Sequence, residues 1–155
     1  MDLETLARRI QVLEDIEAIK KLKVRYCAYC DDNYDADALA SLFTEDAIWD
    51  GGDVLGRSEG REAIRTFFQG SSQRLPFAIH HVMNPIIDVQ GDTGHGQWYL
   101  FQPCTRADRD QAVWLAARYE ETYVRVEDEW KFQRVTIFPA FYTPYDQGWA
   151  KQRFL

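Results

Sequence analysis

The sequence predicts an α+β fold, in which helices come first and a meander of antiparallel strands follows. Before Pro76, apolar residues recur mainly at three- and four-residue steps, which is the period of amphipathic helices. After Pro76, long runs rich in Val, Ile, Tyr, Phe, Trp and Thr alternate with short polar turns, which is typical of strands. The 155 residues show no linker, repeat or low-complexity segment, so we expect one domain over residues 1–155.

Residues 2–30 are predicted to form one long amphipathic helix. Charged residues fill one side of it, and the polar run DDNYD after Cys30 ends the helix, because Asp32 and Asn33 favour turns. The apolar stripe that should face the core consists of Leu6, Ile10, Leu13, Ile16, Ile19, Leu22, Tyr26 and Cys30.

Two shorter helices bring the number of expected N-terminal helices to three. One fits residues 36–43, with Asp35 as its N-cap, and the other fits residues 59–70. Between them, residues 46–49 (DAIW) are predicted as a strand that stops at a pair of glycines. The later strands are expected at residues 77–89, 94–104, 111–126 and 129–138.

An antiparallel sheet preceded by such helices can curl around the long first helix and form a cone. The core then fills one end of the cone and a pocket opens at the other. Pocket residues should come from the end of the first helix and from inward-facing strand positions. The aromatic content of 14% is generous for this length, which is consistent with an apolar pocket.

Composition argues against several classes of function. The formal net charge is −7 and no basic block stands out, so nucleic-acid binding is not expected. No apolar run approaches the ~20 residues of a membrane span, and the N-terminus lacks a signal-peptide pattern, so we expect a cytoplasmic protein without a membrane partner. No phosphate-binding loop or other nucleotide motif is present, and no cofactor is expected.

Cys27 and Cys30 form a Cys-x-x-Cys pair, which raises the question of a metal or redox site. The sequence has three cysteines and no second cluster that would complete a four-ligand zinc site. A redox pair usually opens a helix, where the helix N-terminus lowers the thiol pKa, whereas this pair comes at a predicted helix end. We therefore interpret the cysteines as helix packing and expect no metal.

The histidines and the aspartates after the first helix are candidates for acid–base chemistry. His80 and His81 are adjacent on a predicted strand, so their side chains should point to opposite faces. Asp31 and Asp32 follow the helix, where the dipole disfavours a carboxylate. A partner such as His80 would compensate, and a buried Asp–His pair fixes the imidazole tautomer for proton abstraction. Tyr26 allows two interpretations, a packed ring or a hydroxyl directed into the pocket.

Seven fragments, weak singly but specific in order and spacing, carry a family resemblance over nearly the whole chain. They are DIEAIKKLKVRYCAYCD, LASLFTEDAIWDG, GREAIRTFF, HHVMNPIIDV, GQWYL, YEETYVRVEDEWKFQR and FYTPYDQGWAK. Together they resemble the SnoaL-like group of the nuclear-transport-factor-2-like (NTF2-like) superfamily. The resemblance implies a cone-shaped α+β barrel with three N-terminal helices and a curved, mostly antiparallel sheet. It also implies an Asp–His dyad in an apolar pocket, no cofactor, and a homo-oligomer, either trimer or dimer.

Carried over by position, the resemblance implies catalytic roles for Tyr26, Asp31 and His80. Asp32 is an alternative to Asp31, because the loop that follows differs in length. Within the group, the first and fourth fragments look most like bile-acid 7α-dehydratase, whereas scytalone dehydratase and lindane dehydrochlorinase are more distant.

Two departures from the bile-acid enzyme argue against the same substrate or leaving group. The position of a further acidic residue of that enzyme is Gln102 here. Its late arginine falls near Pro139, with Arg134 the arginine close by. Both departures leave the Asp–His dyad intact.

Residues and resemblance together predict a cofactor-independent lyase, most simply a dehydratase of a hydrophobic, ring-containing, hydroxylated substrate. His80 would remove a proton, Asp31 would orient His80, and Tyr26 would bond the substrate oxygen or assist the leaving group. An isomerase, a cyclase or an aldehyde-releasing retro-aldol lyase with the same dyad stays open, as does a non-catalytic ligand-binding module. The residues expected to bind the substrate are Trp49, Asn84, Trp98, Gln102, Arg134 and Phe138.

Overall fold

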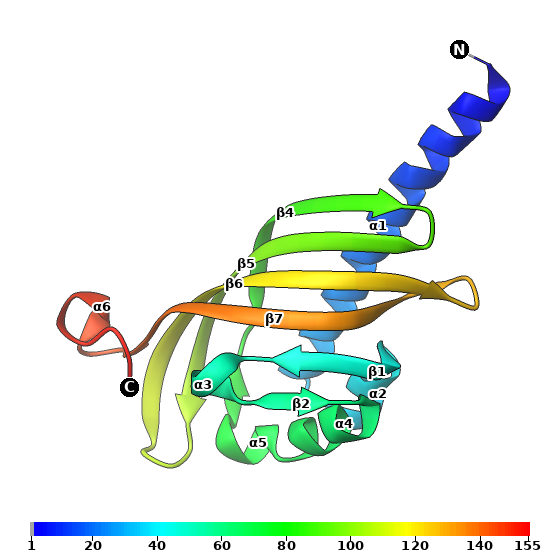
Figure 1. Cartoon of the computed structure of the whole chain (residues 1–155). Coiled ribbons are helices and arrows are strands. Elements are labelled where there is room, and N and C mark those ends of the chain that lie inside the picture. Colours follow the sequence, from blue (N-terminus) through cyan, green and yellow to red (C-terminus); the bar gives the residue numbers. More distant parts are fainter. Residues whose placement is uncertain (1) are drawn as a thin grey trace.

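The computed structural model describes residues 2–155, with helices first and long strands after them (Figure 1). The helices are α1 (Leu3–Asp31), α2 (Ala36–Ser41), α3 (Gly52–Leu55), α4 (Arg61–Gln69), α5 (Ser71–Arg74) and α6 (Gly148–Lys151). The strands are β1 (Phe43–Asp50), β2 (Arg57–Glu59), β3 (Phe77–Ala78), β4 (His81–Gln90), β5 (Thr93–Arg106), β6 (Gln111–Val126) and β7 (Glu129–Pro144).

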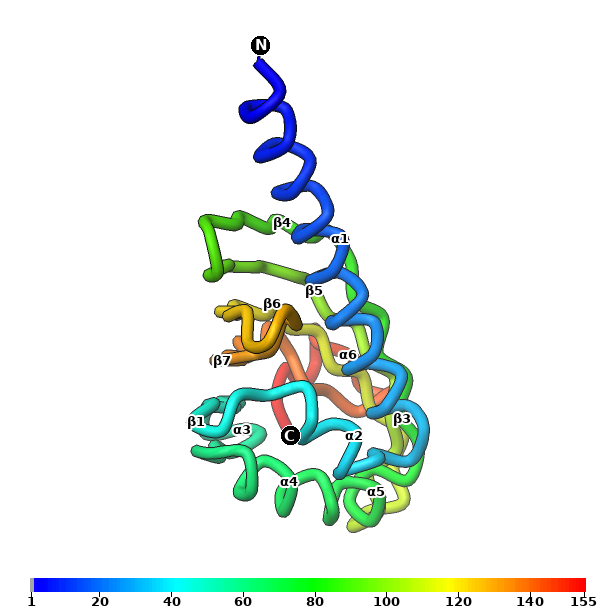
Figure 2. The backbone as a smooth tube through the Cα atoms, turned by 90° about the vertical axis from the view of Figure 1, so that its right-hand side faces the viewer, coloured from blue at the N-terminus to red at the C-terminus, as the bar shows by residue number. Residues whose placement is uncertain are grey.

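The strands form one curved sheet that does not close. Its order is β2-β1-β7-β6-β5-β3, and β4 pairs with the other part of β5. Every pairing is antiparallel except that of β1 with β7, which is parallel. Helix α1 runs along one face of the sheet, and α4 and α5 lie at its lower end (Figure 2). The predicted cone-shaped α+β architecture is thereby confirmed.

The predicted first helix is confirmed over its whole length, but the prediction that its apolar stripe faces the core is right only for the C-terminal half. Ile19, Leu22 and Tyr26 are almost fully buried. Ile10 and Leu13 are 46% and 66% exposed, because these turns extend past the edge of the sheet and nothing covers them (Figures 1 and 2). A buried Asp15 marks the boundary, where it binds Arg125 of β6 at 2.8 Å and Trp130 of β7 at 3.1 Å.

Two of the shorter predicted elements differ at their ends. The second helix stops at Ser41 rather than at residue 43, because Phe43 already pairs with Phe132 of β7 and begins β1. The third predicted helix, 59–70, begins only at Arg61, because the residues before it form β2 against β1. The N-cap prediction for Asp35 is confirmed, since its carboxylate accepts the Ala38 N–H at 3.0 Å.

The strand predicted at 77–89 is divided into β3 and β4, and His80 lies in the gap. The cause is a side chain: the His80 N–H donates to the Asp31 carboxylate and not to a neighbouring strand. His80 and His81 are therefore not successive residues of one strand. His81 is nevertheless exposed, whereas His80 is partly buried.

A buried ion pair joins α1 to the sheet beneath the aromatic core. Lys23 Nζ donates to Glu121 Oε1 at 2.5 Å, and both side chains are fully buried. The Tyr123 hydroxyl donates to the other oxygen of Glu121, and the ammonium lies 3.3 Å from the centre of the Tyr119 ring. Both charges are thus compensated inside the core.

Among the described residues no helix has the length and apolar character needed to cross a membrane.

Candidate active site

A cavity of about 690 Å³ opens between α3, α5 and the turn from β5 to β6. This volume lies within the range of small-molecule sites. Its interior is apolar and aromatic, whereas exposed polar residues surround its mouth. The interior residues include Trp49, Phe67, Phe68, Leu100, Leu115 and Ile137, and the polar residues at the mouth include Gln73, Arg74, Arg106 and Asp108.

His80 lines this cavity, and Asp31, which is not itself a lining residue, binds it from the end of α1. His80 Nδ1 lies 2.6 Å from Asp31 Oδ1. The His80 backbone N–H also donates to both carboxylate oxygens, at 3.0 and 3.2 Å. The His80 side chain is 7% exposed and that of Asp31 is 30% exposed. Of the two candidate aspartates, Asp31 is thus the one that reaches His80, while Asp32 is exposed.

This contact fixes how the imidazole can act. With the carboxylate as acceptor, Nδ1 carries the proton and Nε2 is the basic nitrogen. Asp31 is the last residue of α1, where the helix dipole disfavours a carboxylate. The hydrogen bonds from His80 compensate for that cost, so a carboxylate at this position is explained by the histidine it binds.

Tyr26 is packed in the aromatic core and also borders the cavity. Its ring packs edge-on against Phe43, Phe68 and Phe132, and it also lines the cavity. The hydroxyl accepts the Trp49 Nε1–H at 3.0 Å, and burial raises the pKa of Tyr26 well above its usual value. Tyr26 is therefore a neutral phenol, and its hydroxyl is also a side-chain hydrogen-bond partner of the Cys30 thiol.

Tyr34 lines the same cavity and is not among the site residues that the sequence predicts. It is 8% exposed, and its hydroxyl has no hydrogen-bond partner among residues 2–155. Its ring meets the His80 ring edge-on at 6.2 Å and stacks on Phe68 at 6.3 Å. The backbone has φ 55, a conformation that costs energy for a bulky residue and is common at functional sites. The sequence signal was the lone aromatic in the polar turn DDNYD.

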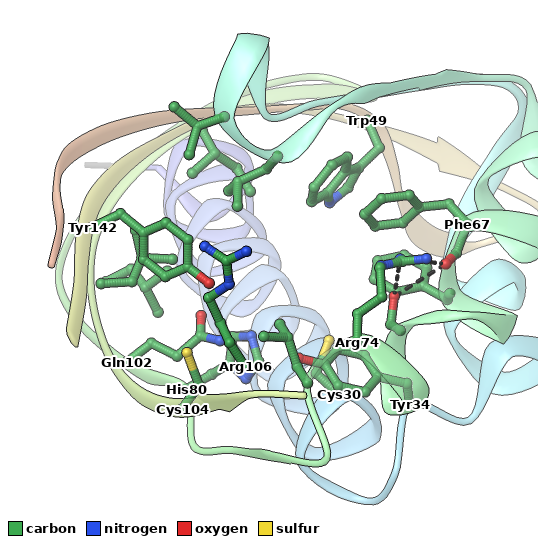
Figure 3. Close-up of a pocket in the computed structure, with 18 of the residues that line it drawn as sticks. Cys30, Tyr34, Trp49, Phe67, Arg74, His80, Gln102, Cys104, Arg106 and Tyr142 are labelled. Carbon is green, nitrogen blue, oxygen red and sulfur yellow. Dashed lines mark hydrogen bonds between the residues drawn. The ribbon is translucent and has the colours of Figure 1, made fainter. Parts of the chain in front are cut away.

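Two of the predicted substrate-binding residues lie at the cavity. Trp49 is buried and its ring packs at 4.5 Å against Phe67. Gln102 is 3% exposed and lines the cavity from β5, close to His80 in Figure 3. No protein group in the described chain engages its amide, which leaves a donor and an acceptor facing the cavity.

The other predicted substrate-binding residues do not line this cavity. Arg134 and Phe138 lie on the far face of the sheet, because Gln133 forms a bulge in β7. An extra residue reverses the in–out alternation beyond it, so Val135 and Ile137 are buried in their place.

Trp98 and Asn84 miss the cavity for different reasons. Trp98 points inward but does not line the cavity; its indole N–H donates at 3.0 Å to the hydroxyl of Tyr123, which binds Glu121. Asn84 is exposed with φ 53, in an irregularity between Met83 and Ile86.

The three cysteines are free and buried. Burial raises the pKa of Cys27 and of Cys104 to about 11, so both are protonated at neutral pH. Cys27 belongs to the core, whereas Cys30 also lines the cavity. Within residues 2–155 no three His, Cys, Asp or Glu side chains gather as metal ligands.

The curved sheet, the apolar cavity and the His–Asp pair define the class of protein. Residues 11–136 match the SnoaL-like domain. The chain belongs to the SnoaL-like family of the NTF2-like superfamily, as the sequence resemblance implied.

Three solved structures show the same fold with appreciable sequence identity. A candidate aromatic ring hydroxylase from Novosphingobium aromaticivorans has a TM-score of 0.79 and 30% identity, over 85% of this chain and 94% of that one. A candidate scytalone dehydratase from the same organism has a TM-score of 0.78 and 25% identity, over 86% and 89%. A hexachlorocyclohexane dehydrochlorinase of LinA type 3 from Novosphingobium barchaimii has a TM-score of 0.75 and 25% identity, over 93% and 94%.

Proposed function

We propose that this protein is a cofactor-independent lyase, most simply a dehydratase, in which His80 is the general base. The observation that supports this most directly is the 2.6 Å contact between Asp31 and Nδ1 of His80, a residue that lines an apolar cavity. Two similar structures bear names of elimination enzymes, a dehydratase and a dehydrochlorinase. Both reactions remove a proton from carbon and a leaving group from its neighbour.

In the proposed reaction, His80 Nε2 takes a proton from a carbon next to a carbonyl or an aromatic system. The electron pair of that C–H bond forms the new double bond, and the bond to the hydroxyl group on the next carbon breaks. Asp31 holds the ring in place and stabilises the imidazolium that forms. The hydroxide leaves as water, with a proton from the imidazolium or from a phenol at the site.

Tyr26 and Tyr34 are the proposed ligands of the substrate oxygen. The Tyr26 hydroxyl already has Trp49 and Cys30 as partners, whereas the Tyr34 hydroxyl has no hydrogen-bond partner among the described residues. We propose Tyr34 as the stronger donor to the substrate, because its ring touches His80. Gln102 is proposed to bind a second polar group of the substrate from β5.

The aromatic walls favour a substrate with one or more rings. Trp49 and Phe67 lie 4.5 Å apart and tilted, and Phe68 meets both of them. Flat apolar ligands stack on such surfaces. The names of the similar structures also refer to ring compounds, an aromatic ring and hexachlorocyclohexane.

The proposal is tested by a spectrophotometric screen of hydroxylated cyclic and aromatic ketones with the wild type and His80→Ala. Wild type should form the unsaturated product, and His80→Ala should lose turnover while remaining folded. His81→Ala is the matched control, since His81 is the exposed neighbour and its loss should leave the rate unchanged. Equal rates for wild type and His80→Ala would refute the role of the dyad.

The product separates the alternatives. Recovery of a rearranged isomer, a cyclised product or a released aldehyde would assign one of the other reactions to the same base. Tight ligand binding without turnover of any compound would favour a binding module. The expected homo-oligomer, a dimer or a trimer, stays a prediction that light scattering on the purified protein would test.

A further inference from the structure

Two arginines stand at the mouth of the cavity, on the two sides of its polar rim. Arg106 is the last residue of β5 and Arg74 is the last residue of α5. The Ala107 N–H donates to the Arg74 carbonyl oxygen at 3.0 Å, which joins the two segments. Both side chains line the cavity, and in Figure 3 they extend into it on opposite sides.

Arg106 is only partly engaged by the protein. Its Nε donates to Asp108 Oδ1 at 3.0 Å and its Nη2 to Asp108 Oδ2. No group among the described residues accepts from Nη1. The guanidinium lies beside the Tyr142 hydroxyl in Figure 3, and its side chain is 23% exposed. One edge of the cation is therefore directed at the cavity.

Arg74 is held in place from the other side. Its Nη2 donates to the Phe67 carbonyl at 2.9 Å and to Ser71 Oγ at 2.8 Å, and its guanidinium lies 4.8 Å from the centre of the Phe67 ring. Gly70 leaves room for it, since a Cβ there would lie 2.8 Å from Arg74 Nη1. Because φ of Gly70 is −92, other residues could adopt its backbone conformation, but a side chain there would displace the end of the Arg74 guanidinium.

The mouth thus carries two cations and one neutralising carboxylate, Asp108. This excess of positive charge is placed on a chain whose net charge is −7, in front of an apolar interior. Low-dielectric walls focus such a field and attract anions. An arginine fork also matches the geometry of a carboxylate, which it binds with two parallel hydrogen bonds.

We propose that the substrate is an amphipathic organic anion, with its rings in the apolar interior and a carboxylate bound at the mouth by Arg106 and Arg74. The inference rests on the proposed function only where it calls the ligand a substrate. The anion site itself follows from the two arginines and is tested by binding alone. Anchoring at the mouth would hold the ring system in one orientation relative to His80.

The test uses matched pairs of ligands, the carboxylate and the primary amide of benzene, naphthalene and anthracene. The members of each pair are similar in shape and differ in charge. Isothermal titration should show at least one carboxylate binding roughly tenfold more tightly to wild type than its amide does. In Arg106→Gln and Arg74→Gln this preference should fall, and in the double variant it should disappear.

Arg118→Gln is the control, because Arg118 lies on the far side of β6, over Phe138, and should leave the preference intact. Gly70→Ala should weaken carboxylate binding because its methyl group displaces the Arg74 guanidinium while every charge is kept. A general electrostatic attraction to the surface would not be weakened by this variant. Equal binding of carboxylate and amide to wild type, no binding of any carboxylate at millimolar concentration, or a preference that survives in the double variant would overturn the proposal. These outcomes do not depend on turnover, so they are separate from failure of the His80 mechanism.

Discussion

Asp31 binds His80 through both the ring and the backbone. The carboxylate lies 2.6 Å from Nδ1 and accepts the backbone N–H at 3.0 and 3.2 Å. The backbone bonds interrupt the strand between β3 and β4 at His80, and the ring contact fixes the tautomer. The strand break and the orientation of the candidate base therefore have the same cause.

Asp31→Asn should reduce kcat by about a hundredfold or more, because the amide no longer stabilises the imidazolium or enforces the Nδ1–H tautomer. The amide oxygen can still accept the His80 N–H, so the fold should be retained. Steady-state kinetics and thermal unfolding check this. Asp32→Asn should behave as wild type, and a comparable loss in both variants would contradict the assignment to Asp31.

Tyr34→Phe should lower kcat/KM by roughly tenfold or more without lowering stability. The hydroxyl has no protein partner, so its removal costs no internal hydrogen bond and relieves a buried unsatisfied group. Tyr26→Phe is the contrasting variant, because it leaves the buried Trp49 Nε1–H without its acceptor and should cost about 1–3 kcal/mol of stability. Unchanged kinetics together with a loss of stability in Tyr34→Phe would assign it a structural role.

The Lys23–Glu121 pair should show strong coupling in a double-mutant cycle. Lys23→Met or Glu121→Gln alone leaves one charge buried without its partner, which should cost about 3–5 kcal/mol. The double variant buries neither charge, so it should be more stable than the sum of the single effects implies, by about 1–3 kcal/mol. Urea unfolding of the four proteins measures the coupling. Additive effects would mean that the two charges do not interact in the folded protein.

Hydrophobic periodicity predicts those parts of this fold in which the local sequence decides which side chains are buried. The buried stripe from Ile19 to Cys30 follows from helical spacing, and the long runs after Pro76 follow from strand composition. The same rule fails at Ile10 and Leu13, which are exposed. Their burial depends on how far the sheet extends, and the strands that decide this are distant in sequence.

The geometry of the site depends more on local irregularities, each of which arises at a single residue. A bulge at Gln133 exchanges Phe138 for Ile137 at the cavity. The position of Asp31 divides the strand at His80, and a left-handed turn brings Tyr34 into the cavity. None of these features has a period that could be read from the sequence. The Asp31–His80 pair could be predicted from the sequence because the family resemblance specifies its positions.

Alkaline conditions should destabilise the protein through its buried thiols. Burial raises the pKa of Cys27 and Cys104 from 9.0 to about 11, so the unfolded chain loses these protons at a lower pH than the folded protein does. Their stabilising contribution is complete below pH 9.0 and declines as the pH rises toward about 11. The loss is on the order of 2–3 kcal/mol for each thiol.

Urea unfolding across this pH range should show a steep fall in the free energy of unfolding for wild type and a shallower one for Cys27→Ala/Cys104→Ala. The slope with pH, and not the absolute stability, is the quantity to compare, because the alanines also create cavities. Parallel curves for the two proteins would show that these thiols do not carry the pH dependence.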